Sequence, residues 1–331
     1  MKGYKGFKAG LVCINKQYAE NTVFEEPKAK ICHSGMHFCE NPFDVLDYYD
    51  LVNSDGSFND FAEVEALAEC DTDDNKKYCT TKLKIGAKLS FAGFIKACVD
   101  FVIEKTAVEP TLFKTTDKNE AVISNKTKNA QIGSSGDYAQ IGSSGDYAKI
   151  GSSGDYAKIG SSGDSAQIGS SGYYAQIGSS GYYAKIGSSG DSAKIGSSGY
   201  YAKIGSSGYY AQIGSSGYYA QIGSSGDSAK IGSSGDYAKI GSSGDSAKIG
   251  SSGDSARIDS TGEDSVICCA GHNSYVKAKK GSWITLSEWK YSREKGRYVP
   301  VCVKTEFVDG EHIKEDTFYR LENGEFKEIE V

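Results

Sequence analysis

The sequence predicts a mainly β protein organised around a central two-sided parallel β-solenoid, a β-roll with 18 residues per coil. The phrase Ile-Gly-Ser-Ser-Gly occurs fourteen times without error, every nine residues from Ile132 to Ile249, and a degraded copy starts at Ile258. A fixed short period is typical of a solenoid. Each unit also keeps an alanine and an isoleucine two positions apart, which places both on one face of a strand. Because alanine and isoleucine make a thin core, two sides per coil are favoured over three.

The repeat divides the chain into three expected parts: a small α+β head (1–115), the solenoid rod (116–261) and a β-rich C-terminal cap (262–331). Ala121-Val122-Ile123 precedes the first perfect unit by nine residues and predicts an entry coil, and 266–269 predicts an exit coil. About seven coils at the ~4.8 Å inter-strand spacing give a rod roughly 35 Å long. Because open ends of such a rod are adhesive sheet edges, we expect head and tail to cap them.

Within one unit, Gly-Ser-Ser-Gly has the composition of a turn, with glycines that supply positive φ angles and close approach. The stretch between turns, such as 137–141, is then the strand. Alternation along that strand turns Ala139 and Ile141 inward and turns Tyr138 and Gln140 outward.

Tyrosines concentrate in the middle of the array. Since successive units alternate between the two sides, one face gathers the residues that we take as candidate binding residues: Tyr182, Tyr183, Tyr200, Tyr201, Tyr218 and Tyr219. The opposite face has a weaker group at Tyr173, Tyr174, Tyr209 and Tyr210. Two interpretations stay open: ladder pairs that stabilise the rod, and an exposed aromatic platform that contacts a partner.

The charges of the array disfavour two classes of ligand. From 131 to 257 it carries nine aspartates and nine lysines or arginines. A neutral rod lacks the basic stripe that nucleic-acid binding rewards. The unit differs from the calcium-binding nonapeptide, because its Asp comes one position early and is Tyr in five of the fourteen units. No calcium and no other cofactor is therefore expected.

The head combines alternating segments with two capped helices. Strands are expected at 4–7, 61–69 and 81–85. A first helix is expected to start at Asn41-Pro42 and continue through Tyr49, and Ser90 is expected to cap a second one. Cys32, His33, His37 and Cys39 could together hold zinc, but their spacing fits no standard finger, so a turn with partly buried side chains is the favoured alternative.

All nine cysteines lie outside the repeat units, and no signal peptide or apolar span of about 20 residues is present. These features predict a cytoplasmic protein with free thiols and no membrane partner.

In the tail we expect a meander of four or five strands, with 282–289 and 298–305 among them and a type I′ hairpin at Asn323-Gly324. The tail's tryptophans are expected in the core.

Two phrases resemble a known but uncharacterised family of phage, prophage and bacterial proteins. Gly-Met-His-Phe-Cys-Glu-Asn-Pro-Phe-Asp-Val-Leu-Asp-Tyr-Tyr (35–49) is similar to its N-terminal domain, and Lys-Lys-Gly-Ser-Trp-Ile-Thr-Leu (279–286) to its C-terminal one. Such proteins join the two through glycine-rich repeats. The resemblance implies a phage context, hence the cytoplasm of a bacterial host, and no established activity.

A looser similarity links the head to ADP-ribosyltransferase-like folds, with Tyr4, Tyr49 and Glu63 or Glu65 as counterparts. An alternating strand with surface glutamates is the ordinary alternative. We expect binding rather than catalysis, since no Walker loop, nucleophile elbow or zincin motif occurs. The leading hypothesis is a phage- or prophage-encoded scaffold that presents head, tail and tyrosines to a host protein, including a defence component. A head enzyme, a surface- or ice-binding solenoid and a homo-oligomer stay as alternatives.

Overall fold

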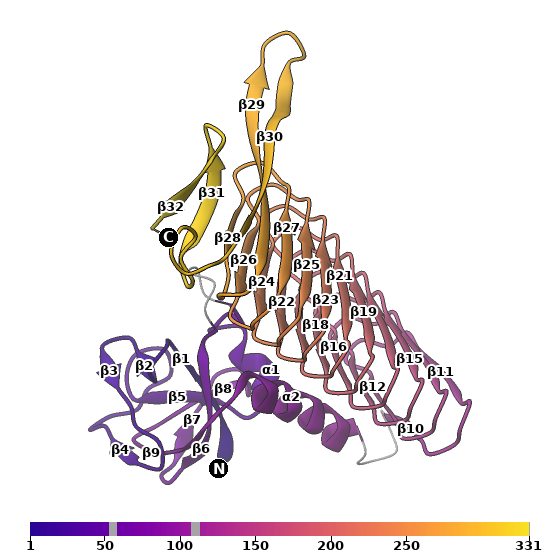
Figure 1. The fold of residues 1–331 in the computed structure, drawn as a ribbon. Helices are drawn as coiled ribbons and strands as arrows, with labels where there is room; N and C mark the ends of the chain where they lie inside the picture. The colour runs from indigo at the N-terminus through magenta and orange to yellow at the C-terminus, as the bar shows by residue number, and fades with distance from the viewer. Residues whose placement is uncertain (53–57, 107–112, 331) are drawn as a thin grey trace.

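The computed structural model describes residues 1–52, 58–106 and 113–330. Its centre is a rod in which two parallel sheets face each other, with about 18 residues per turn and about nine turns over 122–286. Each strand pairs with the strand 18 residues further on, so that Ile132 lies beside Ile150. The predicted fold class is confirmed (Figure 1), and parallel pairing continues as far as Leu286.

Successive units alternate between the two sheets. The 12-stranded sheet, named sheet E, consists of β10 (Phe113–Thr116), β12 (Gln131–Ser134), β14 (Lys149–Ser152), β16 (Gln167–Ser170), β18 (Lys185–Ser188), β20 (Lys203–Ser206), β22 (Gln221–Ser224), β24 (Lys239–Ser242), β26 (Arg257–Ser260), β28 (Tyr275–Lys277), β31 (Phe318–Glu322) and β32 (Glu325–Ile329). The 11-stranded sheet, named sheet F, consists of β11 (Val122–Asn125), β13 (Gln140–Ser143), β15 (Lys158–Ser161), β17 (Gln176–Ser179), β19 (Lys194–Ser197), β21 (Gln212–Ser215), β23 (Lys230–Ser233), β25 (Lys248–Ser251), β27 (Val266–Cys269), β29 (Trp283–Ser292) and β30 (Arg297–Phe307).

The core of the rod contains the predicted alanines and isoleucines. Ala139 is fully buried and Ile141 is 3% exposed, and the same holds along the array. The position of the strand within the unit was wrongly predicted, however. Each strand is (Gln or Lys)-Ile-Gly-Ser, so half of the expected turn phrase is strand. Its serine, such as Ser152, is a third inward residue.

The chain bends instead at Ser-Gly-(Asp or Tyr)-(Tyr or Ser). Repeat glycines do not supply the positive φ that was expected of them; the residue before each alanine does, as at Tyr138 with φ 57°. The expected close approach is confirmed at the second glycine. A Cβ added at Gly190 would lie 2.0 Å from the carbonyl oxygen of Gly172.

The head is an antiparallel sheet with two helices. Its strand order is β4-β9-β6-β1-β5-β8-β7, and β2 and β3 form a separate hairpin. The bounds are β1 (Lys2–Phe7), β2 (Val12–Cys13), β3 (Lys16–Gln17), β4 (Val23–Glu25), β5 (Met36–Cys39), α1 (Pro42–Val45), β6 (Asp60–Ala66), β7 (Cys70–Asp71), β8 (Lys77–Thr80), β9 (Lys82–Leu89) and α2 (Phe91–Thr106).

Both predicted helix caps are present in the head. The Asn41 side chain accepts a hydrogen bond from the backbone N–H of Phe43, and Ser90 Oγ accepts one from Gly93 at 3.1 Å. The first helix is shorter than expected, because it ends at Val45 and only turns follow as far as Tyr49.

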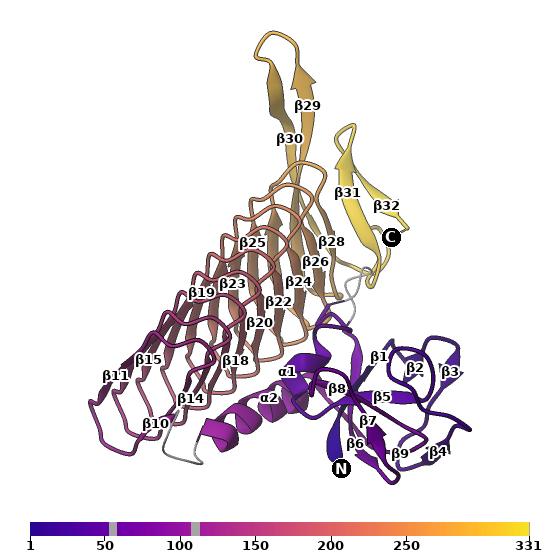
Figure 2. The same cartoon turned by 180° about the vertical axis from the view of Figure 1, so that it is seen from behind.

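The head does not cap the rod, contrary to expectation. It lies against the flank of sheet E, with α2 running along the rod axis across β12, β14, β16, β18 and β20 (Figures 1 and 2). The head's apolar cluster lies at this contact. Phe43, Phe61, Phe94, Ile95, Cys98 and Val102 are all at most 2% exposed, and Phe43 and Ile95 lie beside Gly187 of the rod.

The tail does close one end of the rod, but not as a single meander. The β29–β30 hairpin extends sheet F and the β31–β32 hairpin extends sheet E. The predicted turn is present, with Asn323 and Gly324 at φ 51° and 72°. The prediction for the tryptophans was wrong at Trp283, which is 49% exposed. Trp289 is half-buried and donates from Nε1 to the carbonyl oxygen of Ala270 at 3.0 Å.

Candidate functional site: a double stack of tyrosines beside the head

The candidate binding residues lie on an edge of the rod, in turns, and not on a flat face as predicted. Turns from sheet F to sheet E carry all six, and Tyr237 follows in the same row. We call these seven residues the tyrosine edge. The weaker group at Tyr173, Tyr174, Tyr209 and Tyr210 lies on the opposite edge, as the alternation of units requires.

Two parallel columns of rings make up the tyrosine edge. In the first, the ring of Tyr200 stacks on those of Tyr182 and Tyr218, with centroids 5.1 and 5.4 Å away. In the second, Tyr183, Tyr201, Tyr219 and Tyr237 stack in order at 5.1, 5.0 and 4.9 Å. The six predicted residues keep 40–53% of their surface exposed. The edge therefore presents aligned aromatic rings and hydroxyl groups to solvent.

Backbone geometry holds the second column in place. Each of its residues has a left-handed conformation, with φ of 56° to 58°. The backbone N–H of Tyr183 donates to the carbonyl oxygen of Tyr200 at 2.9 Å, and the N–H of Tyr201 donates to that of Tyr218. A left-handed tyrosine is strained by about 1 kcal/mol or more. These inter-coil bonds keep it there and fix the direction of its side chain.

The first column replaces a structural aspartate. In nine of the fourteen perfect units that position is Asp, and its carboxylate accepts the backbone N–H of the residue 18 positions on, as Asp164 does from Tyr182 at 2.8 Å. All nine aspartates of the repeat act in this way, at 137, 146, 155, 164, 191, 227, 236, 245 and 254. Each carboxylate thus has a structural role, and the described residues contain no group of three or more potential metal ligands.

A tyrosine at this position forfeits that bond. Among the described contacts, the N–H groups of Tyr200 and Tyr218 have no carboxylate acceptor. An exposed charge-assisted bond is worth about 1 kcal/mol, and a stacked aromatic pair about 0.5–1.5 kcal/mol. The two effects are of similar size, so folding stability does not account for tyrosine here. A hydrogen bond to Asp236 also raises the pKa of Tyr218.

The head stands directly beside the second column. A cavity of about 400 Å³ separates them, lined by Tyr183, Tyr201, Tyr219, Tyr237, Lys185, Lys203, Lys239, Gln221, Leu46, Asp47 and Asp50. Tyrosine rings form one wall and the turns after α1 form the other. Tyrosine edge and head thus make one continuous surface.

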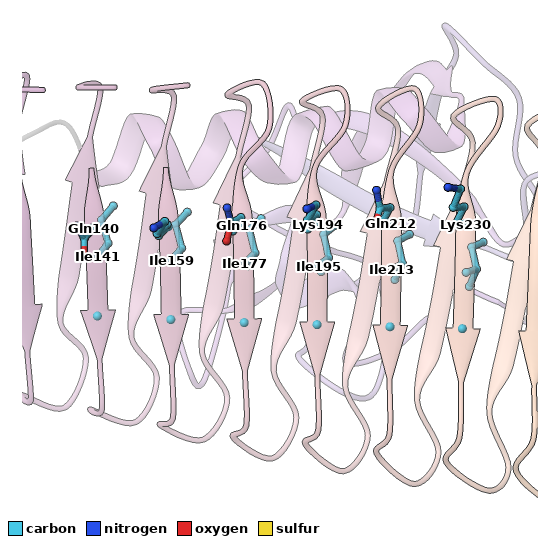
Figure 3. A pocket seen from close by; sticks show the side chains of 18 of the residues that line it. Gln140, Ile141, Ile159, Gln176, Ile177, Lys194, Ile195, Gln212, Ile213 and Lys230 are labelled. Carbon is cyan, nitrogen blue, oxygen red and sulfur yellow. The ribbon is translucent and has the colours of Figure 1, made fainter. Parts of the chain in front are cut away.

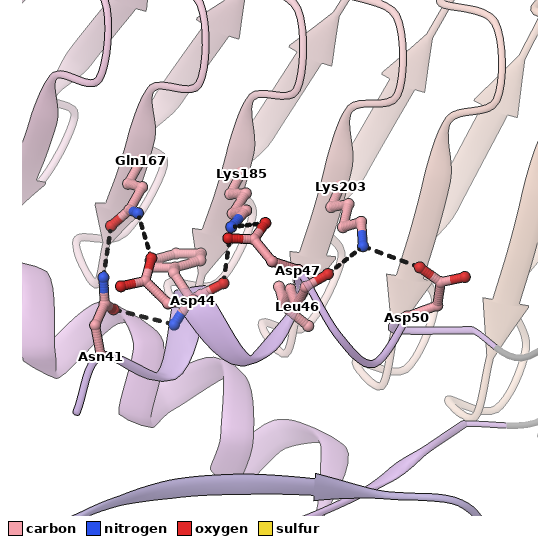
Figure 4. Close-up of polar contacts among 9 residues, drawn as sticks. Asn41, Asp44, Leu46, Asp47, Asp50, Gln167, Lys185 and Lys203 are labelled. Carbon is pink, nitrogen blue, oxygen red and sulfur yellow. Dashed lines mark hydrogen bonds and ion pairs between the residues drawn. The ribbon is translucent and has the colours of Figure 1, made fainter. Parts of the chain in front are cut away.

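Polar contacts fix the head at this place (Figure 4). Lys185 Nζ donates to Asp47 Oδ1 at 2.7 Å and to the carbonyl oxygen of Phe43 at 3.0 Å. Lys203 Nζ binds Asp50 Oδ1 at 3.0 Å and the carbonyl oxygen of Leu46. One coil earlier, Gln167 bridges Asn41 and Asp44. Successive coils therefore meet successive turns of the head segment.

Burial and charge act in opposite directions on these groups. Burial lowers the pKa of Lys203, against the attraction of Asp50. Burial of Asp50 disfavours its charge, but hydrogen bonding to Gln221 and the nearby Lys203 outweigh it and lower the pKa of Asp50. Burial also raises the pKa of Asp44. Ionised Asp50 thus acts beside Asp47 in holding head and rod together.

The head contains a second cavity, of about 650 Å³, which includes the expected Cys32, His33, His37 and Cys39. The cluster does not converge as a metal site would: Cys32 is exposed and Cys39 is buried on β5. His37 Nε2 accepts the backbone N–H of Cys32 at 3.1 Å, and burial lowers the pKa of His37. Lys5 is 4% exposed, and burial lowers its pKa as well.

The residues that the looser similarity suggests are divided between two cavities that share Tyr4. Tyr4 lies opposite Glu63 on neighbouring strands, and these two line one cavity with Glu65. Tyr4 also lines the 650 Å³ cavity together with Tyr49, whose hydroxyl donates to Cys13 Sγ at 3.0 Å. Glu63 and Glu65 are not among the residues that line this second cavity.

Comparison with known proteins adds one finding. Residues 1–97 match a family described as "Domain of unknown function (DUF7666)", which covers the head as far as the first half of α2. Neither the curated proteins nor the solved structures include a significant match. In the part of the chain that the structure describes, every helix is too short or too polar to span a membrane.

The sequence revealed the tyrosines but not their surroundings. Tyr237 and a third stack at Tyr138, Tyr156 and Tyr174 on the opposite edge were missed, although the 18-residue spacing would have shown both. The contacts of Lys185 and Lys203 carried no local signal, because lysines of the same repeat phrase, such as Lys194, lie on the free side of the rod.

Proposed function

We propose that this protein is a non-enzymatic binding scaffold whose tyrosine edge, together with the adjoining head, contacts a macromolecule of a bacterial host, with a host protein as the favoured partner. One observation carries the proposal: the first column of stacked, exposed tyrosines stands where aspartates would serve the rod equally well. Tyrosine is enriched at protein interfaces because it offers large contact area and a hydrogen-bonding hydroxyl at low entropic cost. The resemblance of 35–49 and 279–286 to phage and prophage proteins supports a host partner, including a defence component.

The repeat itself supplies variants that should leave the rod folded. Its natural alternatives are Asp at the first tyrosine position and Ser at the second. An edge variant therefore carries Tyr182→Asp, Tyr200→Asp, Tyr218→Asp, Tyr183→Ser, Tyr201→Ser and Tyr219→Ser. Its matched control places the same changes on the opposite edge: Tyr173→Asp, Tyr209→Asp, Tyr174→Ser and Tyr210→Ser.

Affinity purification from host cells, with quantitative mass spectrometry, compares both variants with the unaltered chain. We expect one partner to be enriched at least tenfold by the unaltered chain and the control, and to be lost with the edge variant. Each central tyrosine of such an interface contributes about 2 kcal/mol or more. Equal enrichment by the edge variant would contradict the proposal, provided that circular dichroism shows the same β content.

A further inference from the structure

Sheet E shows what the outward glycines of the rod can hold. Helix α2 lies across them in register: Phe91 Cζ, Ile95 Cδ1 and Val99 Cγ2 stand 2.4, 2.2 and 3.3 Å from where a Cβ would be at Gly223, Gly205 and Gly187. These helix residues are four apart and the glycines 18 apart, so four residues of helix, about 6 Å, advance along one coil of ~4.8 Å. The column of outward glycines on sheet E thus forms a shallow surface against which an α-helix packs.

Sheet F has the same column of outward glycines, but no described helix packs against it. Its outward glycines recur every 18 residues from Gly142 to Gly250, and a Cβ at any of them would have no described atom within 4 Å. They floor a groove of about 1130 Å³ (Figure 3). The isoleucines beneath keep 3% exposure, whereas those of sheet E under α2 have at most 1%.

Charge along this groove selects the chemistry of an occupant. Beside the glycines runs a column of Gln and Lys, with Lys158, Lys194, Lys230 and Lys248 exposed. The equivalent column on sheet E includes Lys185 and Lys203, which bind carboxylates of the head. Outward strand positions of sheet F from Val122 to Thr285 include no acid. A second copy placed face to face would bring only lysine and glutamine, and no carboxylate, opposite these lysines.

We infer that the outer face of sheet F binds an amphipathic α-helix of a partner protein, with small or β-branched residues toward the glycines and carboxylates toward the lysines. Lys158, Lys194 and Lys230 are two coils apart, or about 9.6 Å, which is six to seven residues of helix. Acidic residues at that spacing, flanking an apolar stripe at i and i+4, would meet three lysines at once.

The groove ends at an apolar patch that extends this surface. Val266 and Trp283 follow Lys248 in the same outward column, and both are about half exposed. Trp283 contacts Phe307 of β30, with centroids 5.1 Å apart. Bulky apolar residues at one end of the helix would cover this patch. The inference concerns a surface other than the tyrosine edge and stands independently of it.

Two fluorescein-labelled helical peptides of about twenty residues provide the test. They share an Ala/Val/Ile stripe at i and i+4 and carry either glutamate or lysine on one flank at six- to seven-residue spacing. Fluorescence anisotropy with the full-length chain should show the glutamate peptide binding at least tenfold more tightly. Lys194→Glu with Lys230→Glu should weaken it tenfold or more, and Gly196→Val with Gly214→Val should abolish it. Tyr210→Ser, on the opposite edge, should change nothing.

Four results would overturn the inference. One is equal or absent binding of the two peptides. Another is binding of the glutamate peptide that persists in the valine variant, whose fold is safe because valine suits an open strand position. The third is tighter binding of a single-stranded oligonucleotide than of the glutamate peptide, lost on lysine but not on glycine substitution; this would assign the groove to polyanions. Sedimentation of the unaltered chain as a dimer that the valine variant dissolves would instead assign it to self-association.

Discussion

At the scale of single residues, each position of the nine-residue unit has its own physical role. Alternation predicted the inward alanine and isoleucine correctly, because that pair is the invariant apolar one. It missed the inward serine, because glycine and serine are typical of turns and composition favoured a turn there. Ser152 is fully buried in a core too narrow for a larger side chain. The two glycines of a unit also differ in role, which composition alone cannot distinguish.

That difference gives a matched pair of substitutions. Gly190→Ala would place a Cβ 2.0 Å from the Gly172 carbonyl oxygen, while Gly196→Ala meets no described atom within 4 Å. We expect the first to destabilise the rod by about 2 kcal/mol or more through backbone displacement. The second should be neutral or stabilising by up to about 1 kcal/mol, since alanine restricts the unfolded chain. Urea unfolding of both variants measures the two changes in stability. Equal stabilities would contradict the different roles of the two glycines.

At the scale of elements, the strands and caps were foreseeable and the docking of the head was not. Asn41, Ser90 and the Asn323-Gly324 turn act through neighbours one to three residues away, so the local sequence carries their signal. Lys185 instead binds Asp47, which lies 138 residues away in sequence. No local pattern separates Lys185 from Lys194 on the opposite sheet. Tertiary contact alone gives one lysine a structural role and leaves the other exposed.

The contact of head and rod should depend on pH through Asp50. Its folded-state pKa lies below the ordinary value, so its contribution is complete above about pH 4–5, the range where an unfolded aspartate is ionised. That contribution is lost as pH falls through the lower, folded-state pKa. Asp44, with its pKa raised by burial, changes stability in the opposite direction and offsets part of the loss.

The variant Asp50→Asn tests this dependence. We expect it to cost about 1 kcal/mol at pH 7, because Lys203 then keeps only a carbonyl partner while Asp50 itself is half exposed. Between pH 6 and pH 3 the variant should lose less stability than the unaltered chain. Urea titrations at both pH values measure the two differences. A variant whose stability falls as steeply as that of the unaltered chain would show that another carboxylate holds the head.

At the scale of the whole molecule, the two-sided solenoid could be predicted from the nine-residue period of the sequence. The placement of the head against the rod could not. Eighteen residues per coil and two sheets were predictable, because only alternate units can share a side. The position of the head was wrongly predicted because the rod has two kinds of surface to cover, its open ends and its apolar flank. The 16-residue helix α2 covers the flank, where Phe91, Ile95 and Val99 pack over the glycines of sheet E.

Insertions in the rod beyond the head test whether successive units alternate between the two sheets. A second copy of residues 230–247 placed after Ala247 adds one full coil. It should lengthen the rod by about 4.8 Å and keep head and tail contacts unchanged. A copy of residues 239–247 alone adds half a coil, so every later unit changes sides. Small-angle scattering and limited proteolysis should show an intact, longer rod for the first and an exposed tail for the second. An intact tail in both would contradict the alternation.

The division of labour within the unit has a consequence for how such a surface can diversify. The residues that determine the fold (Ala, Ile, Gly, Ser) are separate from the two turn residues that face outward. At the first of these turn positions, aspartate and tyrosine give the rod nearly the same folding stability. The outward turn residues can therefore be substituted one unit at a time without any change in the packing of the interior. Exchange of whole units between related genes would generate new recognition patterns in a single step while leaving the scaffold intact.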